Sequence, residues 1–274
     1  MAWSSVDAFV DDVRRSGHPG PQRIVTAALV RCAVHLRERG RAVPDLQLAW
    51  STGIPRSVGL AGSSAIAVGV IDAVAAAAGH HLDPLVVAAL ALDAEVTELG
   101  IAAGWQDRVV QSVGRPVLVD TAEMLERDGT VVPTVRELRP ATPLRLVVGW
   151  DPSSASDSGR YHGSLRRRAD EISAAMAELA ELARRSADAL EAGALGTFAD
   201  GVDRTWRIRR RAVPLRPDHA ALVDAVGATG VAATTPGSGG SVVAVVADAA
   251  AGADEIRVVT ELLGARGASW WVVV

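Results

Sequence analysis

The sequence predicts an α+β fold in two domains, on three observations. Of its 274 residues, 49% are hydrophobic and 22% are charged, which is typical of a chain with a packed core. In the first half, apolar residues recur at helical spacing, as in the series Ile24, Ala28, Cys32 and Leu36. The second half has the order strand, helices, strand, helix, strand, which suits helices layered on one face of a sheet.

In the first half, apolar periodicity with glycine or proline at the ends predicts helices. The expected helices cover residues 21–39, 63–78, 84–99 and 106–113. Alternation of Leu46, Leu48 and Trp50 with polar or small residues predicts a strand, and residues 116–120 predict another. Residues 53–62 are expected to form a loop.

Residues 121–142 are mixed in character and punctuated by prolines, so the domain boundary is placed there. The expected domains cover residues 1–140 and 141–274. In the second domain, apolar runs predict strands over residues 144–150, 241–247 and 269–274. Helices are predicted over residues 164–191, 193–210, 217–226 and 253–264.

Charge and cysteine content narrow the function classes. The net charge of −4 argues against a nucleic-acid partner. The single cysteine, Cys32, cannot form an internal disulfide, and the start of the chain lacks a signal-peptide pattern, so a cytoplasmic location is expected. The apolar run 68–79 contains Asp72 and is too short to span a membrane, so no membrane partner is expected. The basic residues are arginines without a lysine, so phosphate would be neutralised by arginine, backbone amides and a metal.

The most informative segment, residues 54–65, reads Ile-Pro-Arg-Ser-Val-Gly-Leu-Ala-Gly-Ser-Ser-Ala and runs into a predicted helix. Gly59 and Gly62 allow close backbone approach, and the unpaired amides of the first helical turn favour an anion. Ser63 and Ser64 stand where a hydroxyl can cap the helix or bind Mg²⁺. The alternative is an ordinary capped helix after a flexible turn. The segment fits neither a Walker A loop nor the Rossmann spacing.

A second segment places two carboxylates on either side of a glycine-rich turn. Glu95 lies at the end of one predicted helix and Asp107 at the start of the next. Phosphoryl transfer needs a carboxylate on Mg²⁺, which suits Glu95, and a group that takes the hydroxyl proton, which suits Asp107. Arg108 can hold Asp107 ionised or face a phosphate. The alternative is that Glu95 is a solvated helix residue and Asp107 an acid favoured by the helix dipole.

Together, these segments resemble the GHMP kinases, with the closest likeness to glucuronokinase-like sugar kinases. The family loop, Pro-x-x-x-Gly-Leu-Gly-Ser-Ser-Ala, is matched with one extra residue by Pro55, Gly59, Leu60, Ser63, Ser64 and Ala65. Residues 98–109 resemble the acidic segment, residues 157–162 a Ser-Asp-Ser-Gly-x-x-His stretch, and residues 236–241 the third family motif, Thr-Gly-x-Gly-Gly. These matches follow the family order.

The resemblance implies an N-terminal ATP-binding domain like ribosomal protein S5 domain 2 and a ferredoxin-like C-terminal domain. It also implies ATP and Mg²⁺ as cofactors, Asp107 as the catalytic base, and Ser63 and Glu95 as metal ligands. The implied substrate is a small-molecule sugar, and a uronic acid is the leading candidate. The tentative substrate contacts are Trp105, Arg108 and His162. The implied nucleotide-binding residues are Pro55, Gly59, Leu60, Ala61, Gly62, Ser63, Ser64, Ala65, Gly237, Ser238, Gly239 and Gly240.

The sequence departs from the family pattern at two places. Ala232, Ala233 and Thr234 occupy the region where the third motif often carries a lysine, and the first motif is not found, so an incomplete N-terminal domain is expected. A non-catalytic nucleotide- or sugar-binding protein, or an inactive truncated kinase, is therefore the competing expectation. The basic clusters 166–168 and 207–211 are interpreted mainly as solvated helix faces. Oligomeric state is not predicted.

Overall fold

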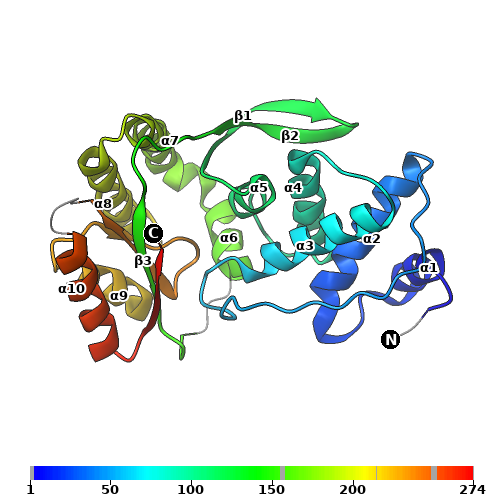
Figure 1. Cartoon of the computed structure of the whole chain (residues 1–274), viewed down its shortest axis with the longest axis horizontal. Coiled ribbons are helices and arrows are strands. Elements are labelled where there is room, and N and C mark those ends of the chain that lie inside the picture. The colour runs from blue at the N-terminus through cyan, green and yellow to red at the C-terminus, as the bar shows by residue number, and fades with distance from the viewer. Residues whose placement is uncertain (1–2, 155–157, 214, 248–251, 274) are drawn as a thin grey trace. The chain divides into compact units, whose positions relative to one another are not determined.

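A computed structural model describes residues 3–154, 158–213, 215–247 and 252–273 of the chain (Figure 1). These residues form two compact units. The first combines Met1–Gly53 with Ala61–Arg136, and the second combines Ile54–Leu60 with Glu137–Val274. The chain therefore changes unit three times, after Gly53, after Leu60 and after Arg136, and the first two changes fall within the predicted loop 53–62. The assignment of residues 1–140 and 141–274 to two kinase domains stays a prediction.

The first unit is mainly helical. Three of its helices pack around one apolar cluster, to which α2 contributes Leu36, α3 contributes Ile71 and α4 contributes Val86. Each of these side chains is fully buried. The elements are α1 (Val6–Ser16), η1 (Gly20–Gln22), α2 (Arg23–Glu38), α3 (Gly62–Ala77), α4 (Pro84–Asp93), η2 (Ala94–Glu98) and α5 (Gln106–Val113). The four helices expected here are present, while α1 was not predicted.

Glycines and packing fix the ends and the pairing of the central helices. Gly40 and Gly79 follow α2 and α3 with φ of 68° and 76°, the left-handed conformation that ends a helix at low cost. Where the two helices meet, the Cys32 thiol donates to the Ile71 carbonyl oxygen at 3.6 Å. Burial, with a smaller effect from Asp72, raises the pKa of Cys32 to about 12. Cys32 is thus a core residue and not a nucleophile.

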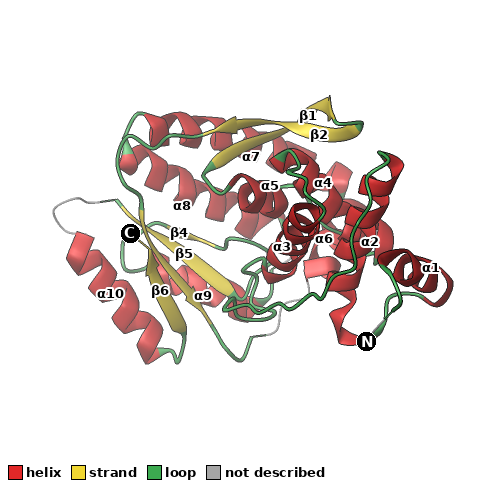
Figure 2. Cartoon of the chain, turned by 45° about the vertical axis from the view of Figure 1, so that its right-hand side comes forward, coloured by secondary structure: helices red, strands yellow, loops and turns green. Residues whose placement is uncertain are grey.

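Two strand predictions in this unit need correction. Residues 46–50 form no strand: Leu46 and Leu48 pack against the helical core, but their backbone pairs with no described strand, and Figure 2 shows this stretch as loop. The mixed stretch 121–142 is largely a hairpin of β1 (Val117–Arg127) and β2 (Thr130–Glu137). Asp128 and Gly129 join the strands with φ of 49° and 66°, as a tight two-residue hairpin turn requires.

Two long predicted helices are interrupted. The helix expected over 84–99 is α-helical only to Asp93 and ends in the wide π-helical turn η2, which contains Glu95. Such turns are frequent at functional sites because the inserted residue re-aims its neighbours. The helix expected over 164–191 breaks at Arg168, which has φ −110° and ψ 19°, into α6 (Ser158–Arg167) and α7 (Ala169–Glu191).

The second unit is built on an antiparallel sheet of order β4-β5-β3-β6. Val147 of β3 pairs with Ala244 of β5, and both face a core completed by α8, α9 and α10. Gly149 allows close packing there, because a Cβ would lie 2.7 Å from the Leu263 side chain. The remaining elements are β3 (Arg145–Trp150), α8 (Leu195–Ala212), α9 (Pro217–Gly227), β4 (Ala233–Thr234), β5 (Ser241–Val246), α10 (Gly252–Ala265) and β6 (Ser269–Val273).

Candidate active site

The start of α3 is built as the phosphate-loop prediction requires. Ala61 has φ 55°, and no side chain caps the first turn of the helix. Its carbonyl oxygen accepts hydrogen bonds from the Ser64 hydroxyl at 2.9 Å and from Gln111 Nε2 at 3.1 Å. Ser64 is thereby buried and fixed, while Ser63 remains exposed. The uncapped amides and the helix dipole make this end of α3 suited to an anion.

Ser63 and Glu95 are in direct contact. The Ser63 hydroxyl donates to Glu95 Oε1 at 2.7 Å, although the two residues are 32 positions apart in the chain. Glu95 projects from the π-helical turn η2 and is only 3% exposed. An isolated buried carboxylate is costly, so its neighbours must compensate its charge.

Arg108 supplies that compensation. Its guanidinium forms an ion pair with Glu95 Oε2, and Nη1 donates to the Gly104 carbonyl oxygen at 3.0 Å. Arg108 is 5% exposed, and burial lowers its pKa to about 10, so it stays charged at neutral pH. This burial does not support the substrate contact that the sequence suggested for Arg108. The guanidinium holds Glu95 instead.

Asp107 is more exposed to solvent than Glu95. Its carboxylate is 3.5 Å from Arg108 Nη1, and its side chain keeps 41% of its surface exposed. Desolvation raises the pKa of Asp107 above its ordinary value of 3.8. The carboxylate is therefore a better proton acceptor than a fully solvated aspartate while remaining accessible. The structure thus brings Ser63, Glu95, Arg108 and Asp107 into one connected polar group.

The donor set fits magnesium. Mg²⁺ prefers hard oxygen ligands and commonly takes one or two from protein and the rest from phosphates and water. The exposed Ser63 hydroxyl and the adjacent Glu95 carboxylate are such oxygens. No group of three or more His, Cys, Asp or Glu side chains among the described residues could hold a metal by itself. Phosphate oxygens would therefore have to complete the coordination.

The second unit contains the other predicted glycine loop, and it packs against the first half of the phosphate loop. A Cβ on Gly237 would lie 2.9 Å from the Gly59 carbonyl oxygen, and one on Gly240 would lie 3.1 Å from that of Val58. Gly59, Gly239 and Gly240 have φ of 77°, 111° and 89°. Only glycine satisfies both the close approach and these torsions at low cost. The predicted residues of the two segments are thus in contact.

Comparison with known proteins identifies relatives of the chain. Residues 27–115 match the model of the GHMP kinases N terminal domain. Probable glucuronokinase 2 of Arabidopsis thaliana is 32% identical over 263 residues, a match that covers 89% of this chain and 69% of that protein. Glucuronokinase 1 of the same plant is 29% identical with the same coverage.

The chain belongs to the GHMP kinase family. It is therefore an ATP-dependent phosphotransferase with an alcohol group as acceptor, and its curated relatives place it among the glucuronokinase-like sugar kinases. Solved structures confirm the expected α+β kinase fold. Streptococcus pneumoniae phosphomevalonate kinase, in complex with phosphomevalonate and AMPPNP, superposes with a TM-score of 0.76 at 16% identity over 93% of this chain and 82% of that one. Lactococcus lactis galactokinase, complexed with galactose, gives a TM-score of 0.61 at 16% identity over 92% and 70%.

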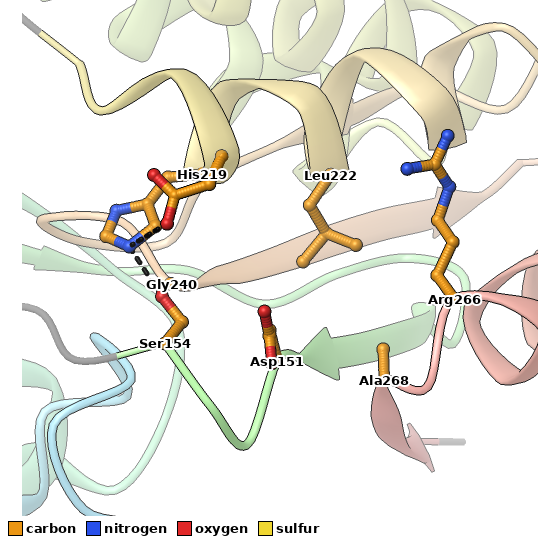
Figure 3. Close-up of a pocket in the computed structure, with 8 residues that line it drawn as sticks. Asp151, Ser154, His219, Leu222, Gly240, Arg266 and Ala268 are labelled. Atoms are coloured by element: carbon orange, nitrogen blue, oxygen red, sulfur yellow. Dashed lines mark hydrogen bonds and ion pairs between the residues drawn. The ribbon is translucent and has the colours of Figure 1, made fainter.

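A small polar cavity of the kinase lies at one end of the sheet of the second unit (Figure 3). Its volume is about 90 Å³, and its lining includes Asp151, Ser154, His219 and Gly240. His219 Nε2 is 2.6 Å from the Ser154 hydroxyl oxygen, and the ring packs against Gly239, whose Cβ would lie 3.0 Å from His219 Cγ. Burial lowers the pKa of His219 below 6.5. Sequence reasoning missed this pair, because the two residues are 65 positions apart.

The candidate substrate contacts Trp105 and His162 belong to different units. Trp105 lines a cavity of about 320 Å³ in the first unit together with Arg31 and His35. His162 lies on α6, half-buried, with its ring edge-on to that of Tyr161 at 5.4 Å. Asp157, from the third matching segment, lies outside the described residues. Within the described residues, no helix is apolar over a length that could cross a membrane.

Proposed function

We propose that this kinase transfers the γ-phosphoryl group of ATP, with Mg²⁺, to a hydroxyl of a uronic acid and releases a sugar 1-phosphate. The polar group Ser63–Glu95–Arg108–Asp107 is the observation that carries the proposal, because it joins a metal-binding oxygen pair to an accessible base. The choice of a uronic acid rests on the names of the curated relatives, glucuronokinase 1 and probable glucuronokinase 2. A cytoplasmic location is part of the proposal.

In the proposed reaction, Asp107 takes the proton of the substrate hydroxyl as that oxygen forms a bond to the γ-phosphorus. The bond between the γ-phosphorus and the bridging oxygen breaks, and ADP leaves. Ser63 and Glu95 would hold Mg²⁺, which supplies charge neutralisation at the phosphates when bound. Arg108 pairs with Glu95 and holds it in place, and its Nη1 lies 3.5 Å from the Asp107 carboxylate.

The nucleotide phosphates would lie on backbone amides. The proposed contacts in the first unit come from the uncapped turn of α3, residues 61–65. Those in the second unit come from Pro55, Gly59 and Leu60 and from the glycine loop of Gly237, Ser238, Gly239 and Gly240. Trp105 and His162 remain proposed substrate contacts. Because glycine has no side chain, a phosphate can approach the backbone N–H groups of such segments closely.

The experiment is a phosphorylation assay with purified protein, Mg-ATP and a sugar panel of D-glucuronate, D-galacturonate, D-galactose and D-glucose. We expect ADP release with a uronic acid and a phosphorus NMR signal of a sugar 1-phosphate. Turnover with neutral sugars alone would reject the uronic acid but keep the sugar kinase. The competing function is a non-catalytic nucleotide- or sugar-binding protein. Calorimetric binding of Mg-ATP without turnover on any sugar would favour that competitor, and absence of binding would favour an inactive chain.

A further inference from the structure

One arginine of the basic run at the end of α8 differs from its neighbours. Its neighbours are exposed and are paired with carboxylates: Arg207 with Asp203, Arg210 with Asp224 at 3.3 Å, and Arg211 with Glu178 at 2.6 Å. Arg209 is half-buried, and the described residues offer it no carboxylate partner. The interpretation of residues 207–211 as a solvated face is therefore wrong for Arg209.

Arg209 points into the glycine loop. Its Nη1 donates to the carbonyl oxygen of Thr235 at 2.7 Å, and its Nη2 donates to that of Gly237 at 2.6 Å. The same Nη2 is 3.1 Å from the hydroxyl oxygen of Tyr161 on α6. A planar guanidinium can hold two carbonyl groups and a hydroxyl in one fixed geometry, which an ammonium on a flexible stem cannot.

The held carbonyls lie within the loop that packs against the phosphate-loop residues Val58 and Gly59. Gly237, whose carbonyl oxygen accepts from Arg209, is also the residue whose Cβ would lie 2.9 Å from the Gly59 carbonyl oxygen. The His219 ring packs against Gly239 of the same loop. The loop is therefore held at Thr235 and Gly237 by the Arg209 guanidinium and at Gly239 by the His219 ring.

We propose that Arg209 is a positioning residue for the phosphoryl transfer, holding the glycine loop in the shape that binds the nucleotide polyphosphate. The inference rests on the proposed function. Its guanidinium orders Thr235 and Gly237, and its positive charge raises the electrostatic potential at the loop that is proposed to bind the anionic phosphates. Through Tyr161, the same side chain joins this loop to α6.

The test compares Arg209→Gln with Arg207→Gln, a matched variant of an exposed arginine on the same helix. Binding of Mg-AMPPNP is measured by calorimetry, and kcat and KM for ATP are measured with the best sugar. We expect Arg209→Gln to weaken nucleotide binding and raise KM by about tenfold or more, as loss of a charged hydrogen-bond donor does. Arg207→Gln should stay within about twofold of the natural protein.

Two further variants separate positioning from charge. Arg209→Lys keeps the charge but loses the two-carbonyl geometry, so its KM should lie between those of the natural protein and Arg209→Gln. Tyr161→Phe should change KM for ATP less than Arg209→Lys does. Thermal unfolding by circular dichroism checks that each variant folds, and Arg209→Lys carries the test if Arg209→Gln does not.

The outcomes distinguish this inference from the proposed function. If the natural protein binds no Mg-AMPPNP and phosphorylates no sugar, the proposed function fails and the role of Arg209 in it fails too. If the natural protein binds and turns over while the Arg209 variants match Arg207→Gln, the proposed function stands and the inference about Arg209 is wrong.

Discussion

In the first unit, the two carboxylate oxygens of Glu95 have different partners. A buried carboxylate needs a partner for its charge, and the proposed role as a metal ligand needs an oxygen that the metal can reach. Arg108 forms an ion pair with Glu95 Oε2, while Oε1 accepts a hydrogen bond from the exposed Ser63 hydroxyl. In the proposed site, a bound metal would take the place of the Ser63 hydroxyl proton at Oε1 and would leave Arg108 paired with Oε2, so the charge of Glu95 would be balanced with and without the metal. The contacts that place Glu95 are thus already formed before a cation binds.

Substitution of the base should separate binding from chemistry. Asp107→Asn keeps the size of the side chain and its place at the start of α5 but cannot accept the hydroxyl proton. We expect turnover to fall by about 10²-fold to 10⁴-fold, as is usual for loss of a general base, with calorimetric binding of Mg-ATP within about threefold of the natural value. Loss of binding in a folded variant would show that Asp107 holds the nucleotide instead.

The raised pKa of Asp107 should appear in the pH dependence of the reaction. The base works only when ionised, so kcat should fall as the pH drops through the pKa of Asp107 in the complex with substrates. Because desolvation raises that pKa above 3.8, the acid limb should lie above the pH at which an exposed aspartate would lose activity. The measurement is kcat with saturating substrates between pH 4 and 8. An acid limb centred at or below pH 3.8 would contradict the assignment.

At the scale of elements, the contact between the two glycine segments gives a prediction of its own. Gly59→Ala places a Cβ against the Gly239 backbone, whose carbonyl carbon would lie 3.2 Å away, at a residue with φ of 77°. We expect a loss of about 1–2 kcal/mol in the free energy of unfolding, from the torsion alone, and a higher KM for ATP. Urea unfolding and steady-state kinetics measure the two effects.

Gly53→Ala is the matched control, because a Cβ there meets nothing within 4 Å and no unusual torsion is imposed. It should change neither quantity by more than about 0.5 kcal/mol or twofold. Equal behaviour of the two alanine variants would mean that the packing of Gly59 on Gly239 matters neither for stability nor for the nucleotide.

The same elements show what a sequence can reveal. Helical periodicity and end signals predicted α2, α3 and α5, since those signals lie within a few adjacent residues. Alternation correctly indicated that Leu46 and Leu48 pack inward, but Trp50 is exposed. A strand also needs a paired backbone, and alternation carries no information on pairing. The Asp128–Gly129 turn was a readable hairpin signal that was missed.

Some residues of the candidate site could likewise be predicted from the sequence, and others could not. The candidates Ser63, Glu95 and Asp107 could be selected from the sequence because the residue types and local turns around them have chemical meaning. The contacts of Arg209 and His219 could not be predicted, because they reach segments at least 26 positions away, and because adjacent arginines hide the one that faces inward. Only the winding of α8 decides which member of such a run faces the loop.

At the scale of the whole molecule, buried histidines in both units link stability to pH. His35, in the first unit, and His219, in the second, are 5% and 6% exposed, and burial lowers the pKa of each below 6.5. Positive charge from Arg39 adds to the effect at His35, and Asp218 partly opposes it at His219. As pH falls through 6.5, the unfolded chain therefore takes up protons that the folded chain does not.

We expect the free energy of unfolding to fall between pH 7.5 and pH 5.5, with a slope of at most about 1.4 kcal/mol per pH unit for each histidine. Asp107 and Asp72 oppose this only at lower pH, because burial raises their pKa from 3.8 and the folded chain then binds the extra protons. Urea unfolding at several pH values measures the slope.

His35→Gln should reduce this slope for the unfolding transition of the first unit, and His219→Gln should reduce it for that of the second. Two separable transitions would show that the units unfold independently. A slope unchanged in both variants would exclude these histidines as its source.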